Sequence, residues 1–201
     1  HSDATARRAF AVVDPLRVTL TNVGDDFCET RTVADFPKDP TRSSHVKTLT
    51  KTLYIERSDF RLVDDKKYYG AAPGKLVGLK YFGNLVVEEA VVDASGEKVL
   101  ELRASYTADR SNGKPKGNLH WASGNVPGGE PAPVVLRLFE HLFTVENPDD
   151  APGSWEDYIN PTSVRVCRGY VDWHVLEAQP LEAFQFERVG YFVVDTKRSE
   201  E

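Results

Sequence analysis

The chain alternates apolar and polar side chains in one segment after another. The alternation runs through residues 15–21, returns at 46–57 and appears again at 184–194. A period of two is typical of a half-buried β-strand, because successive side chains point to opposite faces of the sheet. The same criteria predict further strands at 75–82, 85–92, 99–106 and 164–171, and around His120 and Trp121.

Segments rich in Gly, Pro, Asn and Asp separate these strands, and residues 35–45 and 124–133 are predicted to be crossing loops. Residues 59–67 are predicted to form a short turn-like helix. Residues 134–143 have apolar side chains at helical spacing, which fits either a brief helix or a buried strand. Many short strands with almost no long helix predict an all-β barrel or sandwich.

Residues 184–195 are interpreted as one strand around which the rest is organised. Its aromatic face predicts core, whereas Gln185 and Glu187 lie on the other face and offer donors and acceptors to a planar polar ligand. Strict alternation puts Arg188 on the core side, where a guanidinium is unfavourable. Either the strand bulges or ends there, or a carboxylate holds Arg188; a snorkelling arginine is the plainer interpretation.

Composition indicates an ordinary globular protein of 201 residues, 40% hydrophobic and 28% charged. We expect no transmembrane helix and no signal peptide, and we interpret His1-Ser2 as an expression scar. Cys28 and Cys167 are far apart, so two reduced thiols are expected, with a disulfide as the alternative.

Charge is distributed unevenly along the chain. Residues 38–80 hold ten Lys or Arg against five Asp or Glu, a local charge of +5, although the whole chain carries −6. Contacts to nucleic-acid phosphates need only a local patch, but a solvated lysine-rich face has the same composition.

Several blocks occur together in a fixed order. They are RAFAVVDP at 8–15, LYIERSDF at 53–60, YYG and PGK at 68–75, KPKGNLHW at 114–121, RLF and LF at 137–143, NP at 160–161 and FQFERVGYF at 184–192. Together they resemble the C-terminal anticodon-binding region of glutaminyl-tRNA synthetases and cover nearly the whole chain.

The resemblance implies an all-β fold of two small β-barrels, of the type shared with a ribosomal protein that binds 5S rRNA. The first barrel is discontinuous in sequence. Residues 1–7 would be scar and linker, residues 8–35 with 122–201 the proximal barrel, and residues 36–121 the distal barrel. Members usually continue into another strand that packs on the first barrel. Here the last residues are 199–201, so the fragment is truncated or that strand is deleted.

The resemblance also implies site residues. Gln185, Glu187 and Arg188 match the residues around the middle and third anticodon bases, and Arg8 matches the arginine beside the middle base. An Arg or amide donor with a carboxylate acceptor complements uracil, whose N–H lies between two carbonyls.

The match in the outer segment is looser. Lys67 and Lys80 stand where bacterial members carry a glutamine and an arginine that contact the first or third base. Gly70 and Gly78 stand where those members carry arginines. The candidates to replace these arginines are Tyr68 and Tyr69 by stacking, and Lys38 and Lys75 by phosphate contact.

Catalysis is expected to belong to a parent protein. This chain has neither an HIGH-type nor a KMSKS-type motif, and His120 is interpreted as a packing or structural residue. No cofactor or metal is expected in the fragment. The parent, a cytoplasmic glutamine–tRNA ligase, would charge tRNA-Gln using ATP and magnesium at a catalytic domain of the same chain.

Three alternatives remain open at this point. The barrels also occur in glutamyl-tRNA synthetases, although FQFER and KPKGNLHW favour the glutaminyl form. A ribosomal-RNA-binding protein typically has one such barrel. A structural module that docks other synthetases would bind no RNA.

Overall fold

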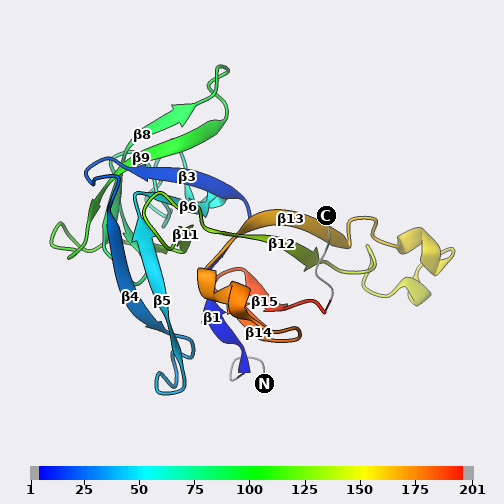
Figure 1. The fold of residues 1–201 in the computed structure, drawn as a ribbon. Coiled ribbons are helices and arrows are strands. Elements are labelled where there is room, and N and C mark those ends of the chain that lie inside the picture. The colour runs from blue at the N-terminus through cyan, green and yellow to red at the C-terminus, as the bar shows by residue number, and fades with distance from the viewer. Residues whose placement is uncertain (1–4, 197–201) are drawn as a thin grey trace.

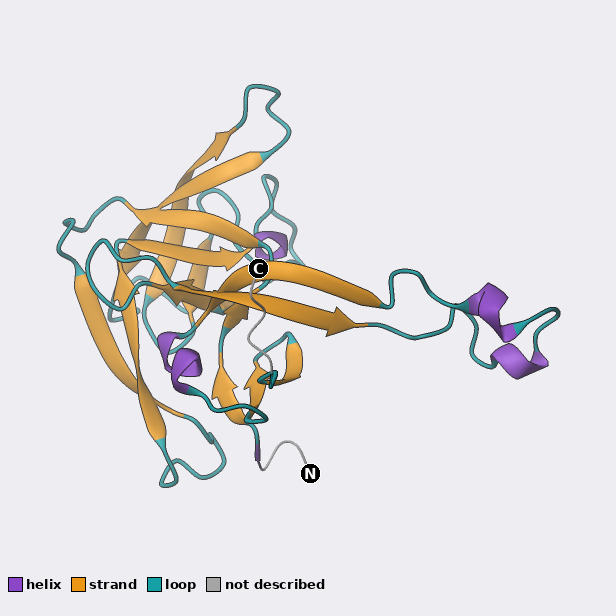
Figure 2. Ribbon diagram, turned by 45° about the vertical axis from the view of Figure 1, so that its right-hand side comes forward, coloured by secondary structure: helices purple, strands orange, loops and turns teal. Residues whose placement is uncertain are grey.

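The computed structural model describes residues 5–196 as short β-strands with four 3-10 turns (Figures 1 and 2). Residues His1-Ser2, interpreted above as a scar, and the last residues 199–201 lie outside this range. The all-β fold class predicted from the alternation is confirmed. No helix among residues 5–196 is long and apolar enough to cross a membrane. The turns are η1 Arg57–Asp59, η2 Pro148–Asp150, η3 Trp155–Tyr158 and η4 Trp173–Glu177.

A seven-stranded sheet forms the larger part of the fold and curls into a barrel-like body (Figure 1). Its order is β10-β7-β8-β9-β3-β6-β11, in which β3 runs parallel to β9 and antiparallel to β6. The strands are β3 Pro15–Leu20, β6 Thr52–Glu56, β7 Leu76–Leu79, β8 Asn84–Val92, β9 Val99–Thr107, β10 Asn118–Leu119 and β11 Trp121–Ser123.

The alternation explains why these residues form this sheet. In β3, Leu16, Val18 and Leu20 are fully buried and the intervening side chains are at least partly exposed. They join a core that includes Leu53, Ile55, Leu102 and Trp121. β3 belongs to segment 8–35, but it is hydrogen-bonded to β6 and β9, which belong to segment 36–121. The division into residues 8–35 with 122–201 and residues 36–121 therefore stays a proposal.

A long antiparallel hairpin of β4 (Cys28–Ala34) and β5 (Ser44–Thr50) flanks the larger sheet (Figure 1). We did not predict β4, because its residues are mostly charged or polar on both faces. The crossing loop expected at 35–45 is the connection of this hairpin. Cys28 and Cys167 are both free thiols, as expected.

The second part consists of two three-stranded sheets. One has the order β12-β13-β2 and the other β1-β14-β15, with β1 parallel to β14. Their smaller core includes Leu136, Val171, Phe184 and Phe186. The strands are β1 Arg7–Ala9, β2 Ala11–Val12, β12 Ala132–Phe139, β13 Val164–Val171, β14 Ala183–Phe186 and β15 Gly190–Val193. The ends of β12 and β13 reach away from the body and carry η2 and η3 (Figure 2).

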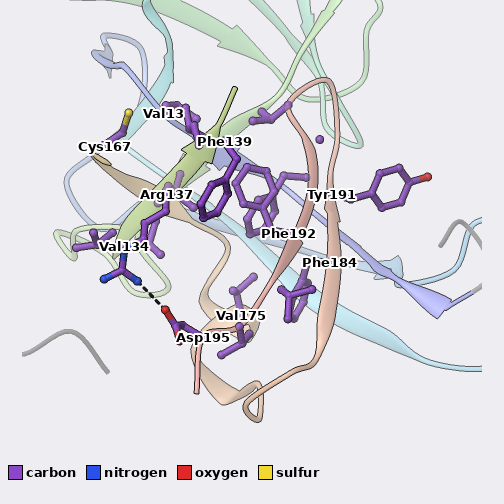
Figure 3. Close-up of a pocket in the computed structure, with 18 of the residues that line it drawn as sticks. Val13, Val134, Arg137, Phe139, Cys167, Val175, Phe184, Tyr191, Phe192 and Asp195 are labelled. Atoms are coloured by element: carbon purple, nitrogen blue, oxygen red, sulfur yellow. Dashed lines mark hydrogen bonds and ion pairs between the residues drawn. The ribbon is translucent and has the colours of Figure 1, made fainter. Parts of the chain in front are cut away.

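Between these two sheets lies an open apolar groove of about 1680 Å³ (Figure 3). Val134, Phe184 and Phe192 line it, and the Arg137–Asp195 ion pair, 2.6 Å between Nη1 and Oδ2, borders it. The second core therefore remains partly open along this side.

Two local predictions were wrong and a third was right only in part. Residues 184–195 form a hairpin, with a turn at 187–189, in place of one strand. The helix expected at 59–67 is absent: the 3-10 turn η1 ends at Asp59, and residues 61–67 form an exposed, irregular loop. Of the two alternatives for residues 134–143, the strand is correct, but β12 is largely exposed at alternate positions rather than buried.

Candidate nucleic-acid interface

The turn between β14 and β15 is the centre of the candidate site. Gln185 is in β14, directly opposite Arg8 of β1 in the parallel pairing, and the Gln185 Oε1 atom is buried with no hydrogen-bond partner among residues 5–196. Glu187 and Arg188 follow in the turn. The two elements therefore bring together all four residues that the matched motifs single out.

Glu187 does not continue the solvent face of a strand. Its side chain is 8% exposed and accepts hydrogen bonds from Lys80 Nζ and from the Tyr81 hydroxyl, the latter at 3.0 Å. Burial and the neighbouring Glu187 carboxylate raise the pKa of Tyr81, so the phenol stays protonated and donates. Lys80, predicted separately from the looser match, thus lies at the same site as Glu187.

Arg188 forms an ion pair, as one of the sequence alternatives required. Its Nη1 and Nη2 donate to Asp59 Oδ2 and Oδ1, both at 2.7 Å. The Asp59 side chain is 8% exposed whereas that of Arg188 is 52% exposed. The hydrogen bond to Asp59 raises the pKa of Arg188 above its ordinary value, although burial opposes this. A fixed, charged guanidinium is consequently presented to solvent.

His120 completes the surroundings of Arg188. Its Nδ1 lies 3.3 Å from Arg188 Nη1, and its Nε2 lies 3.7 Å from Glu56 Oε2. This agrees with the structural role expected for His120. Burial would raise the pKa of Glu56, but the nearby His120 ring and the hydrogen bonds from the backbone N–H groups of Val13 and Asp14 outweigh it and lower that pKa.

Tyr68 lies next to this ion pair. Its hydroxyl donates to the Ser58 carbonyl at 3.0 Å, and the Arg61 guanidinium carbon lies 4.2 Å from its ring centroid. Burial, with the nearby Asp59, raises the pKa of Tyr68 to about 12. The ring therefore belongs to the same surface as Arg188.

The remaining predicted residues differ in their surroundings. Lys75 donates to Asp64 Oδ1 and to the Tyr68 carbonyl, both at 2.6 Å, and is 12% exposed. Lys67 is exposed, and Tyr69 is 67% exposed. Lys38 is exposed in the β4–β5 connection, apart from the β14–β15 turn in sequence and on a different hairpin.

Steric contacts explain the glycine at position 70. A Cβ on Gly70 would lie 2.4 Å from the Tyr68 hydroxyl and 2.5 Å from the Asp59 carbonyl oxygen. A Cβ on Gly78 would lie 2.1 Å from Asn118 Oδ1. Neither position has room for a longer side chain in this arrangement.

The basic patch needs one correction. Lys47, counted among its ten cations, is buried between the Phe10 and Trp121 rings and pairs with Asp172. Burial lowers the pKa of Lys47, and Asp172 partly offsets this. It supports the fold and does not face a phosphate.

A separate buried group consists of Asp35, His45 and His174, whose potential ligand atoms all lie within 4.8 Å of one another. His45 Nδ1 contacts Asp35 Oδ1 at 2.7 Å, and the His45 and His174 rings stack with centroids 3.6 Å apart and planes at 17°. Nearly parallel rings direct their in-plane lone pairs side by side, which does not suit one tetrahedral ion. We therefore assign no metal to this group.

Comparison with known proteins identifies the family of this site. Residues 6–107 match the model of the anticodon-binding domain of class I tRNA synthetases (E and Q), and residues 118–195 match a second model of the same description. The chain belongs to this family.

Curated relatives of this anticodon-binding chain include glutamine–tRNA ligases. The chain is 42% identical over 194 residues to a probable glutamine–tRNA ligase of Dictyostelium discoideum, spanning 96% of this chain and 24% of that protein. It is 39% identical over 203 residues to the glutamine–tRNA ligase of Xanthomonas campestris, spanning 97% of this chain and 34% of that protein. It is 38% identical over 195 residues to the cytoplasmic glutamine–tRNA ligase of Arabidopsis thaliana, spanning 95% of this chain and 24% of that protein. The chain thus spans about a quarter to a third of these relatives.

Sequence reasoning missed Asp59, His120 and Tyr81 as members of this site. Asp59 and His120 stand inside matched blocks, and Tyr81 follows Lys80, so the blocks were the available signal. Nothing in the sequence pairs Asp59 with Arg188, which is 129 positions away.

Proposed function

We propose that this chain is the anticodon-binding region of a cytoplasmic glutamine–tRNA ligase and reads the anticodon loop of tRNA-Gln. The parent protein would use ATP, magnesium and glutamine at a catalytic domain elsewhere in the same chain. The family match and the names of the relatives support this over the glutamyl-tRNA synthetase, ribosomal-RNA and docking alternatives.

The observation that carries the proposal is the convergence at the β14–β15 turn. Arg8 and Gln185 are paired across β1 and β14, and Glu187 and Arg188 follow directly. Sequence-specific proteins read unstacked RNA bases with donors and acceptors of this kind, while cations elsewhere hold the backbone. This turn supplies amide, carboxylate and guanidinium groups within four consecutive positions.

Nearby lysines would hold the phosphates. Lys66 and Lys67 are exposed in the loop before Tyr68, and the Lys116 ammonium donates to the Lys66 carbonyl at 3.3 Å. We infer that these side chains, next to Tyr68 in sequence, provide positive charge near Arg188, which suits a backbone that carries one charge per nucleotide. Tyr69, exposed in the same loop, is available for base stacking.

The test is fluorescence anisotropy with labelled anticodon stem-loops of tRNA-Gln and tRNA-Glu and a 5S rRNA fragment, at two salt concentrations. We expect a preference for the tRNA-Gln loop, which Arg188→Ala reduces by about 1–3 kcal/mol. Lys67→Ala should weaken all three RNAs alike and lower the salt dependence. Equal binding of all three RNAs by the wild type would contradict the proposal, and no binding would favour docking.

A further inference from the structure

The backbone beside Glu187 is unusual at two places. Arg188 has φ = +66° and Tyr81 has φ = +72°, and both residues are non-glycine. The left-handed region costs such residues about 1–2 kcal/mol, and it persists where the surroundings hold the conformation, often at functional sites. Tyr81 donates to Glu187, and Arg188 is the next residue in the turn. Contacts around this turn must therefore stabilise its conformation.

Asp59 is a fixed anchor for the Arg188 side chain. Its two carboxylate oxygens each accept one hydrogen bond from the guanidinium at 2.7 Å. Its own carbonyl accepts from Ala71 N–H at 2.7 Å, and Gly70 packs against that carbonyl without space for a Cβ. Because η1 and this packing fix Asp59, the carboxylate defines where the guanidinium lies.

His120 fixes the guanidinium on a second side. Arg188 Nη1–H can donate to His120 Nδ1 only if that nitrogen is unprotonated, which places the imidazole proton on Nε2, on the side of Glu56. The His120 side chain is 4% exposed, and the backbone amides of Val13 and Asp14 hold Glu56 in turn. Burial therefore supports this second contact, although His120 Nε2 has no hydrogen-bond partner in the described part of the chain, residues 5–196.

The remaining donors of Arg188 lie on one edge. A guanidinium has five N–H groups in a planar fork. Asp59 takes one hydrogen from each Nη, and His120 Nδ1 lies 3.3 Å from Nη1. Within residues 5–196 no hydrogen bond engages the Nε hydrogen or the outer Nη2 hydrogen, and in a planar guanidinium these two are parallel. Parallel donors of this kind match two adjacent acceptors, such as O6 and N7 of guanine or two oxygens of a phosphate.

We propose that Asp59 and His120 are positioning residues for Arg188, holding its Nε and Nη2 edge toward two adjacent acceptors of the bound RNA. This rests on the proposed function, because it describes how the same turn recognises its ligand. Lysine cannot replace Arg188 in this arrangement, since an ammonium lacks the parallel pair.

The first measurement concerns position and uses no RNA. In a nitrogen-15 NMR spectrum, the four Nη hydrogens of Arg188 should give resolved signals, since rotation of the guanidinium is hindered. Asp59→Asn, which keeps the side-chain size, should average these signals. Glu89→Gln is the matched control, since Glu89 pairs with Arg103 at 2.9 Å in an exposed bridge on β8 and β9. Averaged Arg188 signals in the wild type would overturn the proposal.

The second measurement is anisotropy with tRNA-Gln stem-loops that carry guanine or 7-deazaguanine as the third anticodon base. If the acceptors are guanine O6 and N7, the wild type should prefer guanine about tenfold or more. Asp59→Asn, His120→Gln and Arg188→Lys should each reduce that preference, and Asp59→Asn with Arg188→Lys together should lose little more than either alone.

The outcomes separate the possible acceptors and the two proposals. If phosphate is the acceptor, 7-deazaguanine has no effect on affinity. Asp59→Asn and Arg188→Lys then each weaken the binding of every stem-loop, and the two losses are not additive in the double variant. Additive losses, or an Asp59→Asn protein that binds as well as the Glu89→Gln control, would overturn the positioning role. Resolved Arg188 signals without RNA binding would contradict the proposed function alone.

Discussion

Lys47→Met removes the cation from a buried ion pair, Lys47–Asp172, which joins the hairpin β4–β5 to the connection between β13 and η4. Lys47 and Asp172 are 3% and 7% exposed, and Lys47 Nζ also donates to the Trp121 carbonyl at 3.1 Å. Asp172 Oδ2 accepts from Phe10 N–H at 2.7 Å. The substitution leaves Asp172 charged and buried with that one remaining partner.

The magnitude follows from these contacts. Breaking one side of a buried ion pair costs about 3–5 kcal/mol, because the other charge stays uncompensated. The ammonium also lies 4.4 Å from the Phe10 ring centroid and 4.1 Å from that of Trp121, and such cation–π contacts contribute roughly 0.5–2 kcal/mol each. Methionine recovers part of this by packing against the same rings. We expect the free energy of unfolding to fall by about 3–5 kcal/mol.

Urea unfolding at pH 7, followed by tryptophan fluorescence, measures this loss. Lys47→Met with Asp172→Asn should be more stable than Lys47→Met alone, because the amide still accepts from Phe10 N–H and carries no charge. Lys51→Met, directly after β5, is the control, since its partner Asp25 is almost fully exposed and the pair is solvated. A Lys47→Met protein as stable as the Lys51→Met control would refute the reasoning.

Three further predictions concern other parts of the fold. Burial and the adjacent imidazole lower the pKa of His174 from 6.5 to about 4, so the unfolded chain takes up a proton at a higher pH than the folded chain. The free energy of unfolding, measured in urea titrations, should therefore fall by about 2 kcal/mol between pH 7 and pH 5. An unchanged pH dependence in His174→Asn would contradict this. Gly70→Ala should destabilise more than Gly96→Ala in thermal unfolding, because its Cβ would meet the Asp59 carbonyl at 2.5 Å. A Cβ on Gly96 would meet no atom, and only the backbone φ of +77° opposes it there. Equal shifts would contradict the steric argument. Cys28, an exposed free thiol, should react with a thiol reagent in the native protein, and reaction only after unfolding would show that it is covered.

Alternation of side chains was enough to predict the all-β class and most strands of the larger sheet, because β3 and β6 have one buried and one open face. It failed at the β14–β15 hairpin. The three-residue turn keeps odd and even positions in phase, so two strands have the pattern of one. The turn also contains no Asn-Gly or Asp-Gly pair, and the positive φ falls on Arg188.

The candidate site was only partly accessible from sequence for a related reason. Motif matching located Arg8, Gln185, Glu187 and Arg188, which the pairing of β1 with β14 brings together. The groups that hold them come from distant segments, and no local pattern encodes those contacts. Lys47 shows the converse, since a lysine in a basic stretch proved to be part of the core.

The most direct test of the account is the affinity of the wild-type chain for the tRNA-Gln anticodon stem-loop and for the same loop with cytosine as the middle base. Cytosine replaces one carbonyl acceptor of uracil with an amino donor and removes its N–H. We expect at least about tenfold weaker binding of the cytosine loop, comparable to the cost of one lost base contact. Equal affinity for the two loops would contradict the claim that the β14–β15 turn reads the anticodon.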